Sequence, residues 1–380
     1  MNTQPKNSRT RVLPAFSSLT VLCAAALLGL CACMTDSGKD PAPKTEKGFL
    51  FAVTSDRTTG SYSVYGLDSA FQAKDIEPIG SDAVVRYLGG NDIYVLNRYK
   101  RDNLQVIDRH SFKTVLQLAF PPLSNPYDIA VKDSLLYVAF LGLDKIMIYH
   151  QRDGGKKGEI DLSAYADTSD KLPEATELLF VEDDLFVLTA NLDTKKGHAP
   201  LQSHLLKIDV AAGSVKKALD LPYGNPVSMS YDSAAGKIWI PCRGAFFDES
   251  FALKLDGGIV SVELAAFTVK DTVATEAGLG GSLNKLVLHG GKAFMDLSYA
   301  EATKPMEKIV AISLKDGKAE DIATMTGYMV GGLAIDTYTS TLFVGDAENG
   351  LRIFDLATYK ERDPSMVSLG LPTSDLAIIR

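Results

Sequence analysis

The chain has 380 residues, of which 46% are hydrophobic and 23% charged, and its formal net charge is −8. This acidic balance, without a basic stripe, excludes a nucleic-acid-binding protein and argues against binding of anionic lipid through the folded body. The length is sufficient for one large hydrophobic core.

Residues 1–32 are predicted to be a bacterial lipoprotein signal peptide. Basic residues precede an apolar run from about residue 18 to residue 32, which is too short for a membrane-spanning helix. The run ends in Leu30-Cys31-Ala32-Cys33, which resembles the lipobox, where a small residue precedes the cysteine that is acylated. The resemblance implies a palmitate-bearing lipoprotein anchored at Cys33. A secreted protein without lipid is the alternative.

Residues 33–47 are predicted to be a flexible tether because they are polar and contain Pro, Ser and Gly. Resemblance to Gram-negative sorting signals implies the outer membrane, since Met34 rather than Asp follows Cys33. Whether the body faces the periplasm or the exterior stays open. Once the signal is removed and Cys33 is acylated, Cys242 is the single remaining thiol. It is expected to be a small buried hydrophobe, without a disulfide or a cysteine-based metal site.

From residue 48 to residue 380 a four-strand pattern recurs. In each unit the second strand is a continuous apolar run that contains one aromatic residue, and successive aromatics lie 43 to 55 residues apart. The seven aromatics are Phe51, Tyr94, Tyr137, Phe186, Trp239, Phe294 and Phe343. Internal repeats of this period predict an all-β, seven-bladed β-propeller.

The two ends of this region are predicted to form one blade together. Only six of the seven units have an inner strand before their aromatic strand, and residues 49–55 lack one. The run from Asp375 to Arg380 matches the inner strands of the other units and has no strand after it. Pairing of the N- and C-terminal strands would close the ring and remove an open sheet edge.

The unit from Ile93 to Phe140 resembles the YVTN repeat of bacterial β-propellers. Tyr94-Val95-Leu96-Asn97, Val106-Ile107-Asp108 and Asn125-Pro126 fill the conserved places of that repeat. The resemblance implies an envelope propeller, and some surface lipoproteins of this general type capture nutrients for outer-membrane transporters.

The loops that join second to third strands should share one face of a propeller with the mouth of its central channel. In blades 4, 5 and 6 these loops are long and span residues 191–204, 243–258 and 298–308. Because longer loops cost ordering entropy without enlarging the core, their clustering indicates a binding surface over these blades. Neutral insertion in a tolerant surface is the alternative.

Seven residues near this surface are candidates for contact with a ligand or partner. Aromatic side chains in a polar loop either bind something or form a local core, and arginines can donate to an anionic or carbonyl-bearing ligand or simply cover a rim. The candidates are Phe246, Phe247, Phe251, Arg243 and, across the ring, Arg98, Tyr99 and Arg101.

No catalytic residue, metal site or cofactor is predicted. His198 and His204 have no spacing suited to shared ligation and are interpreted as solvated loop residues, and the acidic run at 182–184 as a hairpin turn. Some lactonase propellers bind a divalent cation through Glu, Asn and Asp, and six residues here could resemble that set, although turn chemistry accounts for their pattern. They are Asp128, Glu177, Asp375, Asn125, Asn225 and Asn284.

The sequence therefore favours a lipid-anchored, non-catalytic binding module at the bacterial cell envelope. It would touch the membrane only through its anchor and bind an unidentified small molecule or envelope protein over blades 4–6. A metal-dependent lactonase-like hydrolase at the central channel and a protein assembly scaffold are the alternatives.

Overall fold

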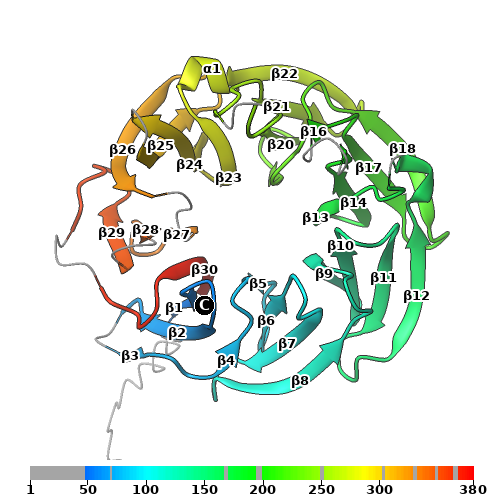
Figure 1. The fold of residues 1–380 in the computed structure, drawn as a ribbon, viewed down its shortest axis with the longest axis horizontal. Helices are drawn as coiled ribbons and strands as arrows, with labels where there is room; N and C mark the ends of the chain where they lie inside the picture. Colours follow the sequence, from blue (N-terminus) through cyan, green and yellow to red (C-terminus); the bar gives the residue numbers. More distant parts are fainter. Residues whose placement is uncertain are drawn as a thin grey trace, which may run out of the picture. The chain divides into compact units, whose positions relative to one another are not determined.

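The computed structural model describes residues 48–68, 71–166, 170–193, 199–248, 252–301, 304–327, 332–346, 350–362 and 367–380. Residues 46–380 form one compact unit. Within it, antiparallel sheets are arranged in a ring as a seven-bladed β-propeller, as the repeat predicted (Figure 1). The predictions for Cys33, His198 and Phe251 fall outside the described residues.

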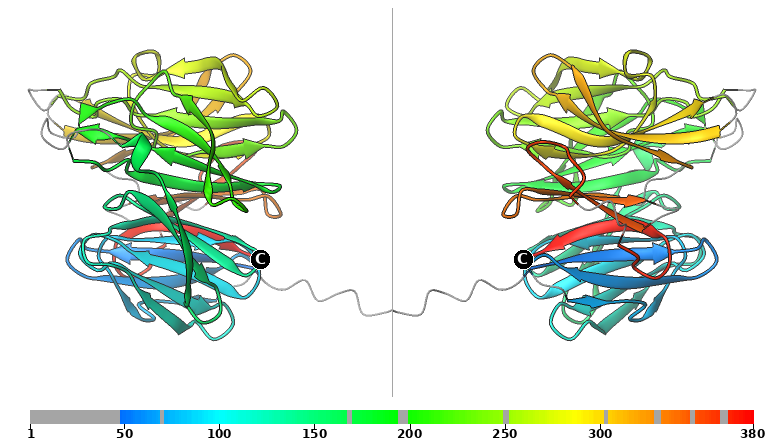
Figure 2. Two further views of the ribbon diagram at one scale, coloured as in Figure 1. Left: turned by 90° about the vertical axis from the view of Figure 1, so that its right-hand side faces the viewer. Right: turned by 90° about the vertical axis from the view of Figure 1, so that its left-hand side faces the viewer.

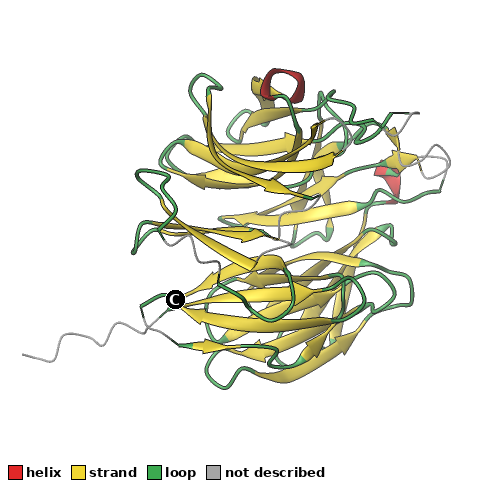
Figure 3. Ribbon diagram, turned by 60° about the vertical axis from the view of Figure 1, so that its left-hand side comes forward, coloured by secondary structure: helices red, strands yellow, loops and turns green. Residues whose placement is uncertain are grey.

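In each blade the strands run from the channel outward, and Figures 2 and 3 show the blades from the side. Blade 1 comprises β30 (Thr373–Ile379), β1 (Phe49–Ser55), β2 (Gly60–Gly66), β3 (Gln72–Ala73) and β4 (Pro78–Ile79). Blade 2 comprises β5 (Ala83–Tyr87), β6 (Asp92–Asn97), β7 (Asn103–Asp108) and β8 (Lys113–Ala119). Blade 3 comprises β9 (Pro126–Lys132), β10 (Leu135–Phe140), β11 (Lys145–His150) and β12 (Lys156–Asp161).

The second half of the ring follows the same plan. Blade 4 comprises β13 (Ala175–Val181), β14 (Asp184–Thr189), β17 (His204–Asp209) and β18 (Ser214–Asp220). Blade 5 comprises β19 (Ser230–Asp232), β20 (Lys237–Cys242), β21 (Gly258–Glu263) and β22 (Thr268–Thr275). Blade 6 comprises β23 (Ser282–His289), β24 (Lys292–Glu301), β25 (Lys304–Ser313) and β26 (Ala319–Thr326), and blade 7 comprises β27 (Leu333–Asp336), β28 (Thr341–Asp346) and β29 (Gly350–Asp355).

Three short elements lie between these strands. A hairpin of β15 (Leu192–Asp193) and β16 (Ala199–Pro200) occupies the long loop of blade 4. A 3₁₀ turn spans Ser163–Tyr165, and α1 (Glu276–Leu279) connects blades 5 and 6. In the described part of the chain no helix is long and apolar enough to span a bilayer.

The N- and C-terminal strands pair in blade 1, which confirms the predicted closure. β1 runs antiparallel to β30 with Phe49 opposite Ile379 and Phe51 opposite Ala377. In Figure 1 β30, in red, lies beside β1, in blue. The inner strand of this blade therefore comes from the opposite end of the chain.

The hydrophobic core is divided into clusters that lie between neighbouring blades. Successive residues of β1 serve different clusters, because Phe51 packs toward blade 2 while Leu50 and Ala52 pack toward blade 7. All seven residues of β1 are buried, so both faces of the strand are covered. This arrangement explains why second strands read as continuous apolar runs. Cys242, at the end of β20, is buried as predicted.

Two local predictions were wrong. Residues 298–308 of blade 6 do not form an open loop, because β24 and β25 extend through most of this segment and pair Ser298 with Glu307 and Tyr299 with Met306. Ser298, Met306 and Glu307 are buried, which favours a continued hairpin. His204 is not a solvated loop residue. It begins β17, packs its ring at 5.7 Å from that of Tyr165, and burial lowers its pKa.

Candidate functional site

The inner strands place one equivalent residue of each blade near the central channel. We call this set the inner ring. It lies two residues before the residue that pairs with the aromatic of the second strand, as set by the register of each blade. From blade 1 to blade 7 the inner ring consists of Asp375, Val84, Asp128, Glu177, Ser228, Lys285 and Gly332.

Polar members of the inner ring fasten each blade to the next one. In four cases the side chain accepts a backbone hydrogen bond from the next blade. The donor is the N–H of the residue that directly follows the inner-ring residue of that blade. The four pairs are Asp375 with Val85 (2.9 Å), Asp128 with Leu178 (2.8 Å), Glu177 with Met229 (2.5 Å) and Ser228 with Leu286 (3.1 Å). Since buried N–H groups need acceptors, these contacts are structural.

Arg86 lies among the acidic members of the inner ring. Its Nε donates to Asp128 at 2.5 Å, and its Nη1 lies 3.6 Å from a carboxylate oxygen of Asp375. Nη1 also donates to the Val85 carbonyl oxygen at 2.8 Å. Burial alone would lower the pKa of Arg86, but Asp128, Asp375 and Glu177 outweigh it and raise that pKa. The guanidinium is therefore held by internal carboxylates.

Glu177 is the inner-ring residue with the largest change in proton affinity. Burial, together with the charge of Asp128, raises its pKa to about 8, although Arg86 opposes the change. This shift favours the protonated form of Glu177, while the Arg86 guanidinium contacts Asp128. A buried group with this pKa couples the junction of blades 4 and 5 to pH.

The three acids considered for a lactonase-like cation site, Asp128, Glu177 and Asp375, do lie near one another. The group at their centre is the Arg86 guanidinium. Both carboxylate oxygens of Asp128 already have partners, Arg86 and the Leu178 N–H. In the described residues no group of three or more His, Cys, Asp or Glu side chains could hold a metal ion. The positive charge beside these carboxylates is therefore the Arg86 guanidinium.

The asparagines of that set lie elsewhere. Asn125 and Asn225 have positive φ angles of 50° and 54°, which asparagine tolerates better than most residues, so they serve turns. Asn284 donates to Asp296 at 2.6 Å and to Ser298 at 3.1 Å. The turn interpretation of the asparagines at 125 and 225 is therefore confirmed.

A second group of polar residues lies at the channel mouth, on the face of the second-to-third-strand loops. Arg98 follows β6, Arg243 follows β20, and Tyr127 stands near the start of β9. The Arg98 guanidinium lies 4.8 Å from the centroid of the Tyr127 ring. Burial disfavours the charged forms of both arginines, and the nearby Tyr127 is among the groups that act in the opposite direction. We call Arg98, Tyr127 and Arg243 the mouth cluster.

Arg243 has hydrogen-bonding capacity to spare. Its Nε donates to the Leu283 carbonyl oxygen at 2.9 Å, and its guanidinium stacks 4.6 Å from the Phe246 ring centroid. Within the described residues, Nη1 and Nη2 make no hydrogen bond. Burial lowers the pKa of Arg243, and the nearby Asp296 and Tyr127 offset this only in part. Burial likewise raises the pKa of Asp296 to about 6.

Arg98 is less free but is not saturated. Its Nη2 donates to Asp82 at 2.5 Å, on the loop before β5. Its Nε is buried and has no hydrogen-bond partner in the described part of the chain. A buried N–H without an acceptor costs about 1–3 kcal/mol, so an acceptor at this position would be stabilised.

The other predicted contact residues lie around the mouth cluster. Phe246 and Phe247 pack edge to face with ring centroids 4.3 Å apart, so part of the predicted local core exists, yet Phe247 remains 40% exposed. Tyr99 and Arg101 are exposed on the loop of blade 2. Among the described residues, neither Tyr99 nor Arg101 contacts Arg243, so these two flank the mouth cluster.

Sequence reasoning missed Arg86, Tyr127 and Asp296. A signal existed for Arg86, which interrupts the apolar inner strand AVVRYL with a charge. Asp296 likewise interrupts an apolar second strand of blade 6. Tyr127 carried no such signal, since a tyrosine after Asn-Pro is ordinary at the start of a strand.

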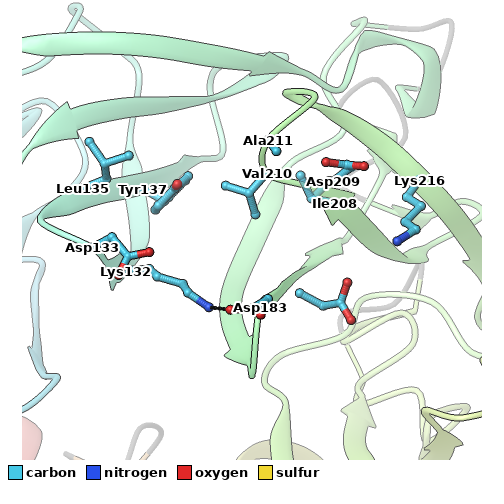
Figure 4. A pocket seen from close by; sticks show the side chains of 11 residues that line it. Lys132, Asp133, Leu135, Tyr137, Asp183, Ile208, Asp209, Val210, Ala211 and Lys216 are labelled. Atoms are coloured by element: carbon cyan, nitrogen blue, oxygen red, sulfur yellow. Dashed lines mark hydrogen bonds and ion pairs between the residues drawn. The ribbon is translucent and has the colours of Figure 1, made fainter.

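The opposite face carries two hollows between blades. One, of about 480 Å³, lies between blades 3 and 4 and is shown in Figure 4, where Lys132 pairs with Asp183 in front of Tyr137. The other, of about 640 Å³, lies between blades 5 and 6 beside Trp239. Asp183 and Asp184 each pair with a lysine, Lys132 and Lys207. The acidic run is thus a hairpin turn, as predicted.

Comparison with known proteins identifies the fold alone. No family model matches the chain, and no curated protein does. Among solved structures, it is similar to a putative 6-phosphogluconolactonase from Bacteroides fragilis, with 12% identity, 90% of this chain and 100% of that chain covered, and a TM-score of 0.61. Hydrazine synthase from Kuenenia stuttgartiensis matches with 12% identity, coverages of 73% and 78%, and a TM-score of 0.57. Apo AztD from Citrobacter koseri matches with 11% identity, coverages of 88% and 98%, and a TM-score of 0.53.

Proposed function

We propose that this protein is a lipid-anchored, non-catalytic binding module of the bacterial cell envelope that holds an anionic small molecule at the channel mouth. The carrying observation is the mouth cluster, in which Arg98 and Arg243 lie near one phenol and retain unused N–H donors. The YVTN-like repeat and the lipobox at Cys33 support the envelope setting.

The chemistry of the mouth cluster favours a carboxylate or phosphate. Guanidinium groups bind these anions through paired, charge-assisted hydrogen bonds. Arg243 is desolvated without a carboxylate in direct contact, and an incoming anion would restore the interactions that burial removed. Phe246 and Phe247 beside it supply an apolar edge for the rest of the ligand.

The alternatives have weaker support. The structural likeness to a putative 6-phosphogluconolactonase rests on 12% identity and concerns the fold. The carboxylates that a lactonase-like metal site would use are engaged by Arg86 and by backbone N–H groups. A scaffold role would need a surface that binds another protein, and none of the observations at the mouth calls for such a surface.

The proposal is tested with the body, residues 46–380, purified gently from an envelope extract and weighed by native mass spectrometry before and after chelation. We expect a bound organic acid that survives chelation. Arg243→Met should lower its affinity at least about tenfold, because a hydrogen bond to a charged group is worth about 1.5–3 kcal/mol.

Arg101→Met is the matched control, because it removes the same charge from the exposed rim nearby. It should leave affinity within about twofold, since an exposed charge acts weakly through solvent. Equal losses of affinity in Arg243→Met and Arg101→Met would show that the ligand responds to overall charge and not to the mouth cluster. A ligand lost on chelation would favour the hydrolase instead, and a bare protein mass would favour the scaffold.

A further inference from the structure

Large exposed hydrophobic side chains are unevenly distributed on the face opposite the mouth. On that face, within the described residues, they are Phe71, Leu88 and Tyr338, with exposed fractions of 47%, 46% and 82%. They stand on turns of blades 1, 2 and 7, which are neighbours in the ring. The described turns of blades 3 to 6 on this face carry no comparable residue.

Contacts within the fold link the turns of Tyr338 and Leu88 through Arg380, and Phe71 packs separately beside β1. Tyr338 stacks on the Arg380 guanidinium at 4.7 Å from the ring centroid. The Arg380 carbonyl oxygen accepts a hydrogen bond from the Tyr87 hydroxyl at 3.0 Å, and Leu88 follows Tyr87 directly. Phe71 packs on Phe112, whose ring in turn contacts Phe49 at the start of β1. We call Phe71, Leu88 and Tyr338 the apolar turns.

The N-terminal segment joins the propeller at the same place. A Cβ atom built on Gly48 would lie 2.7 Å from Cγ of Arg380, so Gly48 touches the residue that holds Tyr338. Residues 34–47 connect this point to Cys33, and at no more than about 3.5 Å per residue they span at most about 50 Å. A lipid on Cys33 would therefore keep the apolar turns close to the bilayer.

The charges beside the apolar turns suit a neutral lipid surface. Arg380 pairs with Asp336 at 2.6 Å and lies 3.4 Å from Asp68, so one guanidinium lies between two carboxylates near Tyr338. The chain as a whole is acidic, which disfavours electrostatic attraction to anionic lipid. Aromatic side chains and leucine, in contrast, partition into the interface of a bilayer.

We propose that the apolar turns insert into the membrane interface and orient the propeller, with the channel mouth facing away from the bilayer. This contact of the folded body departs from the sequence-based expectation that the protein touches the membrane only through its anchor. The proposal rests on the lipid anchoring proposed above. The tether supplies a high local concentration, so three side chains suffice to fix orientation even where they would bind a free membrane weakly. The mouth would then be presented to ligands in solution.

The test places a fluorescent thiol probe on Leu88→Cys or, as the matched control on the opposite face, on Tyr99→Cys, which is 60% exposed. Cys242 is buried, and burial raises its pKa, so it should not react. The body, residues 46–380, is one compact unit and is attached through an N-terminal histidine tag to phosphatidylcholine vesicles that contain a chelating lipid and brominated acyl chains.

We expect bromine quenching of the probe at position 88 and none at position 99. Adding Phe71→Ser and Tyr338→Ser to the Leu88→Cys protein should weaken that quenching about tenfold or more, because the remaining apolar area cannot hold the face in the interface. Equal quenching at both positions, or none at position 88, would overturn the proposal. So would protection of position 88 by self-association without vesicles. Binding of the anionic ligand at the mouth is measured separately and does not depend on this outcome.

Discussion

Arg86 and Arg243 are both partly buried beside the central channel, yet their surroundings differ. Arg86 contacts Asp128 and Asp375, and their charges raise its pKa. Arg243 donates to a carbonyl oxygen and stacks on Phe246, and burial lowers its pKa. One arginine is paired with carboxylates within the fold, and the other keeps Nη1 and Nη2 donors that no described residue accepts.

The difference separates a structural charge from a binding charge. Removing Arg86 would leave buried carboxylates without a counter-charge, whereas removing Arg243 would relieve a desolvated cation. Both substitutions take away the same group at a similar depth. Stability and binding measurements on the two variants should therefore give opposite patterns.

The largest effect is expected for Arg86→Met. It should lower the free energy of unfolding by about 3–5 kcal/mol, because Asp128 and Asp375 would be buried unpaired. Urea denaturation at neutral pH measures this loss. Adding Asp128→Asn should recover part of it, and additive losses in the double variant would show that the two groups are not coupled.

An intermediate effect is expected from the pH dependence of Glu177. Its folded pKa of about 8 exceeds the ordinary value of 4.5, so the folded state holds a proton that the unfolded chain releases. Stability is therefore favoured at low pH and declines as the pH rises from about 4.5 to about 8. Glu177→Gln, which mimics the protonated form, should remove this decline, worth on the order of a few kcal/mol.

Urea titrations of both proteins between pH 5 and pH 8.5 give the comparison. The difference between them isolates Glu177 from the other titrating groups. Parallel curves across this range would contradict a protonated Glu177 at the junction of blades 4 and 5.

The smallest change in stability is expected for Arg243→Met. The lost hydrogen bond to Leu283 and the relief of desolvation oppose each other, so unfolding should change by no more than about 1 kcal/mol. Because Arg243 lowers the pKa of Asp296, its removal should raise that pKa above about 6. Carboxyl NMR titration measures the shift. A destabilisation as large as that of Arg86→Met would make Arg243 a structural residue as well.

Much of the fold could be predicted from the sequence because it depends on short-range patterns. Second strands covered on both faces must be apolar throughout, which made the aromatic series visible. The match of Asp375–Arg380 to the other inner strands was enough to predict its pairing with β1. Residues 298–308 were wrongly predicted to be a loop because many of them are polar. Their polar composition obscures the alternation that buries Met306 and Ser298 in a hairpin.

The site was less accessible to sequence reasoning because its contacts cross the ring. Arg86 meets Asp128 and Asp375 only when three blades are placed around one channel. Arg98 of blade 2 stacks on Tyr127 of blade 3, a contact between blades that no local spacing encodes. Arg98 and Arg243 were identified because both follow second strands, where propeller loops gather at the mouth.

The pairing of β1 with β30 also sets the order of events during synthesis. Ser374, for instance, bonds the carbonyl oxygen of Val53 across 321 residues of chain. Until β30 has been synthesised, β1 lacks its inner neighbour and the ring stays open. A chain that is truncated before β30 cannot close the ring in this way, so closure requires the C-terminal strand. Because contacts so distant in sequence form slowly, closure of the ring should be a late step of folding.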